Sequence, residues 1–279
     1  MNKVLPLVSL RRVCRALDVN RSSVYLPQES SPKQTKTRVD EEIAGRLHAL
    51  VQQHPTFGYR RLWALLRFGQ NLTVNLKKVH RIVQLRGWQV KERLVAPRPR
   101  VQQKVSRTER SDERWAMDVT HVYCGKDGWG HLAAVIDCHD REVVGFEFAL
   151  RGRAKEAERA LEEACLSRFG TLRPARPTPT LRSDNGLIFT SKRFRAACQF
   201  YRLSQEFITP YTPEQNGLIE RFFRSLKEEC AWQHHFGGFD EARREIARWI
   251  DWYNRERPHQ ALGYLSPATF RQNRQQTVV

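Results

Sequence analysis

Three acidic residues, Asp118, Asp184 and Glu220, are the side chains in this chain best suited to metal chemistry. Asp118 lies in RWAMDVTHVY, Asp184 ends TLRSD, and 35 residues separate Asp184 from Glu220. A hard divalent cation such as Mg2+ prefers oxygen ligands in octahedral geometry. Two such ions about 3.5–4 Å apart can hold the attacking and leaving oxygens of a phosphodiester. Two strand aspartates and one helix glutamate would carry enough charge for that pair, which predicts phosphodiester chemistry.

Glu220 falls in a predicted helix over residues 213–232 that is also rich in basic side chains. Helical spacing places four polar residues on one face: Asn216, Glu220, Arg224 and Lys227. On a solvated helix such a row is an ordinary ion-pair ladder that contributes little to stability. Beside a metal site it would present cations to a phosphate backbone, so we expect Asn216, Arg224 and Lys227 to contact DNA.

The elements that must position these acids form an α/β pattern. Alternating and apolar runs predict five strands. Four lie at 115–124, 129–138, 143–150 and 203–208, and the remaining strand, between the third and the last of these, ends at residue 184. Amphipathic helices are predicted at 154–169, 191–201 and 239–253. Asp118 shares a strand face with Ala116 and Thr120. We assign Asp137 and Asp140 to a hairpin turn and His259 to a structural role, in preference to metal binding.

Two helical segments precede this pattern. Residues 7–26 resemble a helix–turn–helix whose first helix would bury Leu10, Val13 and Leu17. The start of its second helix would offer DNA-binding candidates to a groove, namely Arg21, Ser22 and Ser23. An ordinary helical hairpin is the alternative. Helices at 39–53, 59–68 and 76–86 form a second unit. Its basic side chains are expected to bind phosphates, namely Arg60, Arg61, Lys77, Lys78 and Arg81.

Charge is unevenly distributed along the 279 residues. Residues 1–110 hold 23 Lys and Arg against 7 Asp and Glu, whereas residues 111–279 hold 25 against 23. A basic first part joined to a near-neutral second part indicates nucleic-acid binding followed by a catalytic body. The segment 92–112 has no apolar periodicity and is read as a linker that follows DNA through Arg98, Arg100 and Lys104.

The six cysteines are scattered and form no CxxC pair, which favours a reducing compartment and argues against structural zinc. No apolar run approaches the roughly 18 residues of a membrane span. These features predict a cytoplasmic, nucleoid-associated bacterial protein without a membrane-spanning segment.

The segments RWAMDVTHV, SDNG and PYTPEQNGLIERFFRSLK together resemble the Asp-Asp-35-Glu core of retroviral integrases and related transposases. With the basic region before the core and the tail YNRERPHQALGYLSPATF, they are similar to insertion sequence family-three transposases of the OrfB type over about residues 40–272. The resemblance implies a ribonuclease H-like core, a mixed five-stranded sheet with flanking helices, preceded by all-α helix–turn–helix DNA-binding domains. The domains are then 1–37, 38–91, the linker 92–112, the core 113–232 and a helical extension 233–279.

The resemblance also implies an activity. A Mg2+-dependent transposase, in which Mn2+ is expected to substitute, would cleave element ends and join the free 3′ hydroxyl to another strand. Asp118 would bridge two ions, with Asp184 on one and Glu220 on the other. The expected partners are double-stranded DNA (terminal inverted repeats and target), further copies of this chain on that DNA, and the product of an upstream reading frame. Many relatives act fused to that product, so this chain is expected to be one portion of the active protein or to have lost that need.

Two other functions stay open at this point. One is a Mg2+ nuclease of the same fold that cuts without joining. The other is a non-catalytic DNA-binding repressor that keeps the fold, a reading that a missing acid would favour; all three acids are present.

Overall fold

The computed structural model describes residues 9–20, 39–90, 108–174, 177–209 and 213–276. The chain forms two compact units, Met1–Glu41 and Glu42–Val279. No helix among the described residues is both long and apolar enough to cross a membrane.

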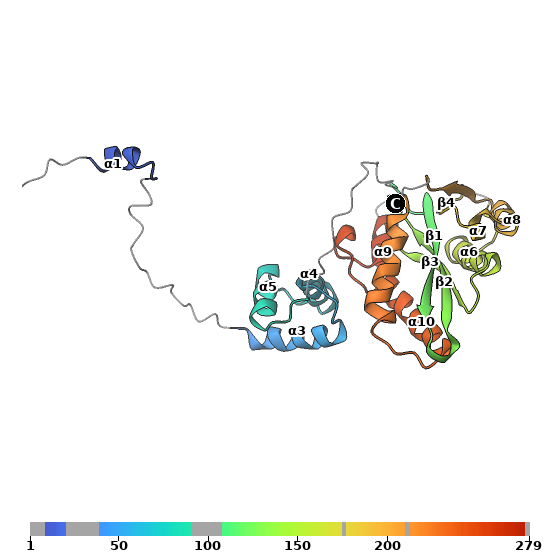
Figure 1. Cartoon of the computed structure of the whole chain (residues 1–279), viewed down its shortest axis with the longest axis horizontal. Coiled ribbons are helices and arrows are strands. Elements are labelled where there is room, and N and C mark those ends of the chain that lie inside the picture. Colours follow the sequence, from blue (N-terminus) through green and yellow to red (C-terminus); the bar gives the residue numbers. More distant parts are fainter. Residues whose placement is uncertain (1–8, 21–38, 91–107, 175–176, 210–212, 277–279) are drawn as a thin grey trace, which may run out of the picture. The chain divides into compact units, whose positions relative to one another are not determined.

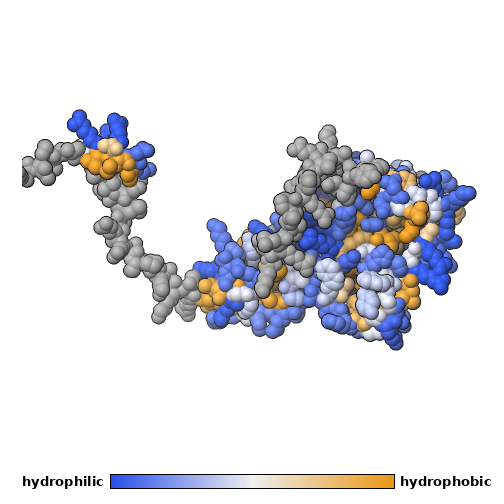
Figure 2. Space-filling view, in the orientation of Figure 1, coloured by the Kyte–Doolittle hydropathy of each residue, from blue (hydrophilic) through white to orange (hydrophobic). Residues whose placement is uncertain are grey.

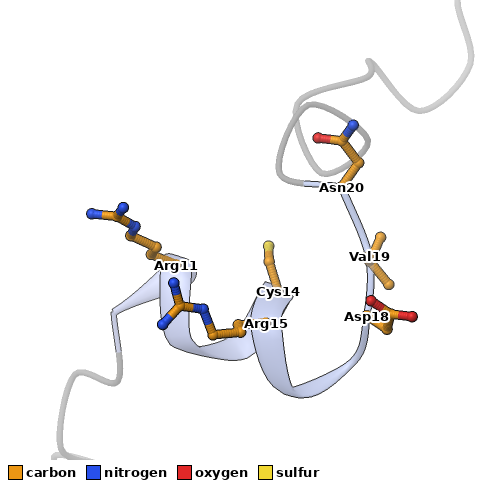
Figure 3. Close-up of a pocket in the computed structure, with 6 residues that line it drawn as sticks. All are labelled: Arg11, Cys14, Arg15, Asp18, Val19 and Asn20. Carbon is orange, nitrogen blue, oxygen red and sulfur yellow. The ribbon is translucent and has the colours of Figure 1, made fainter.

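The described part of the first unit is one short helix, α1 (Leu10–Ala16), and its burial differs from the expected pattern. Cys14 is buried, but Val13 is 39% and Leu17 67% exposed, so the prediction that both are buried was wrong. Hydrophobic surface gathers along one side of α1 (Figure 2). The helix then bends back through Val19, whose N–H donates to the Cys14 carbonyl at 3.0 Å, and Cys14 lies inside the bend (Figure 3). The recognition candidates Arg21, Ser22 and Ser23 lie outside the described residues.

Three predicted helices open the second unit. They are α3 (Glu41–Gln53), α4 (Tyr59–Ala64), which continues as a π-helical turn η1 (Leu65–Gly69), and α5 (Leu76–Leu85). Their apolar stripes are buried, at Leu47, Leu50, Leu62, Leu66, Val79, Ile82 and Val83. Asn75 begins α5 because its side chain accepts the Lys77 N–H at 2.8 Å, a standard N-cap bond.

The predicted five-stranded mixed sheet is confirmed, with the strand order β3-β2-β1-β4-β5. Its strands are β1 (Arg114–Tyr123), β2 (Trp129–Asp137), β3 (Val143–Ala149), β4 (Thr180–Ser183) and β5 (Ser204–Phe207). β1, β2 and β3 pair antiparallel through short turns, whereas β4 and β5 run parallel to β1. A parallel partner requires a crossover, and α6 (Ala154–Phe169) supplies it between β3 and β4.

Helices cover both faces of the sheet (Figure 1). One face packs against α6, α7 (Leu187–Thr190) and α8 (Lys192–Phe200), around Trp115, Met117 and Leu181. The other packs against α9 (Gly217–Leu226) and α10 (Phe239–Arg255), around Ala116, Val122 and Leu132. The last helix is α11 (Pro267–Gln276). Because successive strand residues face opposite sides, Asp118 lies on the α9 face together with Ala116.

Asp137 and Asp140 stabilise the β2–β3 turn, as predicted. The Asp137 carboxylate accepts N–H groups from Asp112 at 2.7 Å, His139 at 2.8 Å and Asp140 at 3.1 Å. Asp140 is fully buried, and both its oxygens accept from Nη2 of Arg168 on α6, at 2.9 and 3.1 Å. The sequence did not single out Arg168, because an arginine late in an amphipathic helix ordinarily faces water.

Replacing Arg168 with Met should destabilise the chain by roughly 3–5 kcal/mol, because the substitution leaves the Asp140 carboxylate buried without its cation. The measurement is urea unfolding followed by tryptophan fluorescence. The matched control is Arg159→Met on the same helix. Its 3.2 Å pair with Glu147 has a half-exposed guanidinium, so the loss should stay below about 1 kcal/mol. Equal losses in the two variants would contradict this account.

Candidate active site

The pairing of β1 with β4 brings two of the predicted acids level with each other. Ala116 pairs with Arg182 in the parallel register, and Asp118 and Asp184 each follow two residues later. Adjacent strands lie about 4.8 Å apart, and a step of two residues returns to the same face. Both aspartates are half-buried. The two carboxylates therefore stand next to each other where β4 ends.

A tight turn orients Asp184. Its Oδ1 accepts the Gly186 N–H at 2.9 Å, and Asn185 donates its Nδ2 to the Ile208 carbonyl at 2.9 Å, so the turn is tied to β5. A Cβ on residue 186 would lie 2.9 Å from Asp184 Oδ1, a contact that real side chains do not make. Gly186 thus gives the Asp184 carboxylate room to accept this bond, and Asn-Gly is a sequence typical of turns.

The helix that carries Glu220 begins later than predicted. Residues Pro213–Asn216 form a 3-10 turn and α9 starts at Gly217, whereas a helix from residue 213 was expected. Gln215 holds this start: its carbonyl accepts from Arg182 Nη1 at 3.0 Å, and its Oε1 accepts the Thr209 N–H at 2.9 Å. Arg182 is itself buried and pairs with Glu206 on β5 at 3.0 Å. β4 therefore fixes both Asp184 and the beginning of α9.

The apolar face of α9 fixes the direction of Glu220. Ile219, Phe222, Phe223 and Leu226 are buried against the sheet and α10. Glu220 is exposed at the edge of that buried face. The helix thus presents its carboxylate towards the strand acids without burying it.

The three acids influence one another electrostatically. The pKa of Asp118 is raised from 3.8 to about 6, chiefly because the carboxyl is buried. The Val119 N–H, which donates to Asp118 Oδ1 at 2.7 Å, lowers that pKa, the charges of Asp184 and Glu220 raise it, and Lys227 lowers it. Among the described residues, no group of three or more His, Cys, Asp or Glu is close enough to hold a metal ion as placed. The acids thus lie near one another in an open arrangement.

The polar residues predicted on the Glu220 face have separate environments. Lys227 is half-buried and its charge acts on Asp118. Arg224 is exposed and pairs with Glu228 at 3.0 Å. Asn216 is only 3% exposed, and its Oδ1 is buried without a hydrogen-bond partner. The predicted DNA contact of Asn216 is not supported by this placement, because its side chain is buried.

Family models match most of the chain. An "HTH-like domain" covers residues 38–94, and two models described as "Integrase core domain" cover residues 108–213 and 201–267. The "Insertion element IS476 uncharacterized 39.2 kDa protein" of Xanthomonas euvesicatoria is 32% identical over 267 residues, which are 95% of this chain and 73% of that protein. The chain belongs to the insertion sequence family-three transposases of the OrfB type.

Other relatives of this transposase are named in the same terms. The "Transposase InsD for insertion element IS2D" of Escherichia coli (strain K12) is 26% identical over 94% of this chain and 90% of its own length. Among solved structures, the catalytic core domain of BIV integrase covers 60% of this chain and 97% of that one, at 20% identity and a TM-score of 0.43. The HTLV-2 integrase catalytic core domain in complex with magnesium covers 59% and 99%, at 19% identity and a TM-score of 0.42. The two integrase core matches and the mixed sheet in the order β3-β2-β1-β4-β5 confirm the predicted ribonuclease H-like core.

The HTH-like domain of the transposase presents part of its predicted basic set to solvent. Arg60, Lys77 and Arg81 are exposed and Lys78 is half-buried. Arg61 differs, because its Nη1 donates to Glu229 Oε1 at 3.0 Å within the protein. The prediction that Arg61 binds phosphate is not supported by this placement, since its charge is already paired. The linker candidates Arg98, Arg100 and Lys104 lie outside the described residues.

His259 is buried, in keeping with the structural role predicted for it. It is 6% exposed, and burial lowers the pKa of its imidazole to about 2, helped by the charge of Arg257. Tyr253 lies edge-on to its ring at 4.8 Å between centroids. A neutral histidine enclosed in this way packs the tail against α10.

The pKa of Asp118 leads to a stability prediction for metal-free protein. A folded-state pKa raised from 3.8 to about 6 means that ionisation of Asp118 costs stability progressively as pH rises through that window. Asp118→Asn keeps an acceptor for the Val119 N–H and removes the charge, so it should raise the melting temperature at pH 7.5. That gain should disappear near pH 4.

Differential scanning fluorimetry in EDTA at both pH values makes the measurement. The matched control is Asp251→Asn, at an exposed acid paired with Arg255, which should change the melting temperature little at either pH. If Asp118→Asn gave no gain at pH 7.5, the acid would not be held at a cost to stability.

Proposed function

We propose that the chain cleaves DNA at the ends of an insertion element and joins the freed 3′ hydroxyl to another strand. Asp118, Asp184 and Glu220 would be the acids that serve both steps. The observation that carries this proposal is the register of β1 with β4, which sets Asp118 level with Asp184 while Glu220 acts on the same carboxyl. The half-buried Asp118 has a pKa raised by burial and by the charges of the other two acids, and perturbed acids grouped in this way are frequent at functional sites.

The donor set suits Mg2+, with Mn2+ as a substitute. All three donors are carboxylates, the ligands that hard divalent cations prefer, and two come from a rigid sheet. Their repulsion raises the pKa of Asp118, and a bound cation would remove that repulsion. When bound, divalent ions polarise the phosphodiester and favour deprotonation of the attacking hydroxyl. Glu220 lies on the exposed side of α9, and its carboxylate would move closer to Asp118 and Asp184 when the cation and DNA bind.

The remaining side chains of the site have supporting roles. Lys227 is half-buried close to Asp118 and would contact a phosphate held by the acids. Arg182 keeps the start of α9 in place through the Gln215 carbonyl. The same acids would serve hydrolysis with water and then transesterification with the 3′ hydroxyl, so a covalent protein–DNA intermediate is not required.

DNA binding completes the proposal. Exposed Arg60, Lys77 and Arg81 of the HTH-like domain would bind phosphates of double-stranded terminal repeats, and Arg224 would act nearer the acids. A solved structure similar to this chain is the simian T-cell lymphotropic virus intasome, at 18% identity and a TM-score of 0.47. We propose that several copies of the chain act together on DNA in the bacterial cytoplasm, with the product of an upstream reading frame as a further partner.

Asp184→Asn should reduce Mg2+-dependent cleavage of an element-end oligonucleotide by at least about 10³-fold, or roughly 4 kcal/mol of transition-state stabilisation. Gel-shift affinity for the same DNA should stay within about threefold, because the phosphate contacts are elsewhere. Asp251→Asn, at a surface acid of α10, serves as the matched control and should cleave normally. Retained nicking by Asp184→Asn would defeat the acid assignment, and cleavage without joined product in the unmodified chain would indicate a nuclease.

Lys227→Ala should weaken DNA binding to all sequences alike and reduce the salt slope of log K by about one. It should also raise the pKa of Asp118, because the Lys227 charge lowers that pKa. Fluorescence anisotropy at several salt concentrations, with element-end and unrelated duplexes, measures the first effect. A loss confined to element ends would contradict a phosphate contact.

A further inference from the structure

Glu229, in the helical turn that continues α9, is a buried carboxylate bound by two arginines from other parts of the chain. Arg257 donates from Nε to Glu229 Oε2 and from Nη2 to Oε1, both at 2.7 Å. Arg61 donates from Nη1 to Oε1 at 3.0 Å. The side chains of Glu229 and Arg257 are 6% and 4% exposed, whereas that of Arg61 is 37% exposed.

The two arginines come from different elements. Arg61 lies on α4 in the HTH-like domain, and Arg257 follows α10. The ring of Phe57, which is 2% exposed, packs against both guanidinium groups, with its centroid 5.0 Å from Arg61 Cζ and 5.9 Å from Arg257 Cζ. His54 stacks on Trp252 of α10 at 5.1 Å between ring centroids. The helix–turn–helix segment thus touches the core through a polar cluster with aromatic packing around it.

Glu229 and Glu220 lie on one continuous helical rod but face opposite ways. α9 continues directly into the π-helical turn η4 (Lys227–Ala231), so no loop separates the two acids. Nine residues at 100° each bring Glu229 to about 180° from Glu220. One side of the rod therefore faces Asp118, through Glu220 and Lys227, and the other side faces Arg61 and Arg257. π-turns within helices are frequent at functional sites.

We propose that Arg61 and Glu229 are positioning residues, through which the HTH-like domain sets the position of α9 and hence of Glu220. This inference rests on the proposed function, since it concerns how the third acid reaches the site. Arg257 anchors Glu229 to the core whether or not the HTH-like domain is engaged. Arg61 adds an ion pair between Glu229 and the HTH-like domain. A shift of that domain when it binds DNA would therefore also shift the helix that carries Glu220.

The geometry separates this role from a purely structural one. Removing Arg61 leaves Glu229 paired with Arg257 in its bidentate contact, so the core keeps its buried ion pair. Removing Glu229 would instead leave two arginines together and is expected to impair folding. Arg61→Met is therefore the informative variant. Arg60→Met, at the adjacent exposed arginine over Tyr59, removes the same charge from the same helix without touching Glu229.

The experiment uses the full chain with element-end duplex and Mg2+, at saturating DNA. Arg61→Met should reduce the single-turnover cleavage rate by about 10-fold or more, since small misplacements of catalytic groups carry such costs. Its DNA affinity should remain within about threefold of the unmodified chain. The activity control is Arg46→Met, at an exposed arginine of α3 that pairs with Glu42, and it should keep both the rate and the affinity of the unmodified chain. Arg61→Lys should recover most of the rate, because the ammonium keeps the charge contact with Glu229.

A second measurement is independent of activity. Amide hydrogen exchange over residues 217–231, in EDTA and without DNA, should be at least about threefold faster in Arg61→Met than in Arg60→Met. Equal exchange in the two variants, or a loss in Arg61→Met that is confined to DNA affinity, overturns the inference. If the unmodified chain did not cleave, the proposed function would fail while the exchange comparison still decided the positioning role.

Discussion

The parallel pairing of β1 with β4 is the constraint on which the site depends. It joins residues more than sixty positions apart in the sequence, and β2, β3 and α6 lie between them in the chain. Two buried clusters, one on each face of the sheet, hold this pairing in place. Because the side-chain period of a strand is two, a slip of one residue would send Asp118 to the α6 face and abolish its proximity to Glu220. Packing on both faces makes such a slip costly.

The ionised carboxylate of Asp118 lowers the stability of the fold, whereas ion pairs elsewhere in the core raise it. A half-buried carboxyl whose pKa reaches about 6 is ionised at neutral pH only at a free-energy cost. Elsewhere in the core, the buried Asp140 is paired with Arg168, and the half-buried Glu206 is paired with Arg182 and Arg114. Those ion pairs stabilise the fold, whereas the charge of Asp118 is held at a cost to stability. Arg182 has two roles, since it pairs with Glu206 and also donates to the Gln215 carbonyl in the turn before α9.

Strand alternation and helical periodicity were sufficient to predict the sheet, its flanking helices and the face on which Asp118 lies. Those patterns reflect burial against large apolar neighbours, as at Trp115 and Ile250, and burial of that kind is visible in a single sequence. The partners of individual charges were not visible. Nothing local distinguishes Arg61, which pairs with a glutamate 168 positions away, from the exposed Arg60 beside it. Asn216 was read as part of the helical face that contacts DNA, because periodicity does not reveal that it ends a 3-10 turn and is buried.

The region after residue 232 is as much a part of the core as the strands are. α10 contributes Ile246, Trp249, Ile250 and Tyr253 to the cluster that holds Phe222 of α9. At its start, the Phe239 N–H donates to Asp127 Oδ2 at 2.7 Å, and a Cβ on Gly125 would lie 2.2 Å from the Phe236 carbonyl oxygen, so this end interlocks with the β1–β2 turn. A fragment cut at residue 232 would expose the inner surface of α9 to water, and an uncovered apolar patch of that kind promotes aggregation. Soluble pieces of this protein for crystallisation or spectroscopy should therefore retain α10.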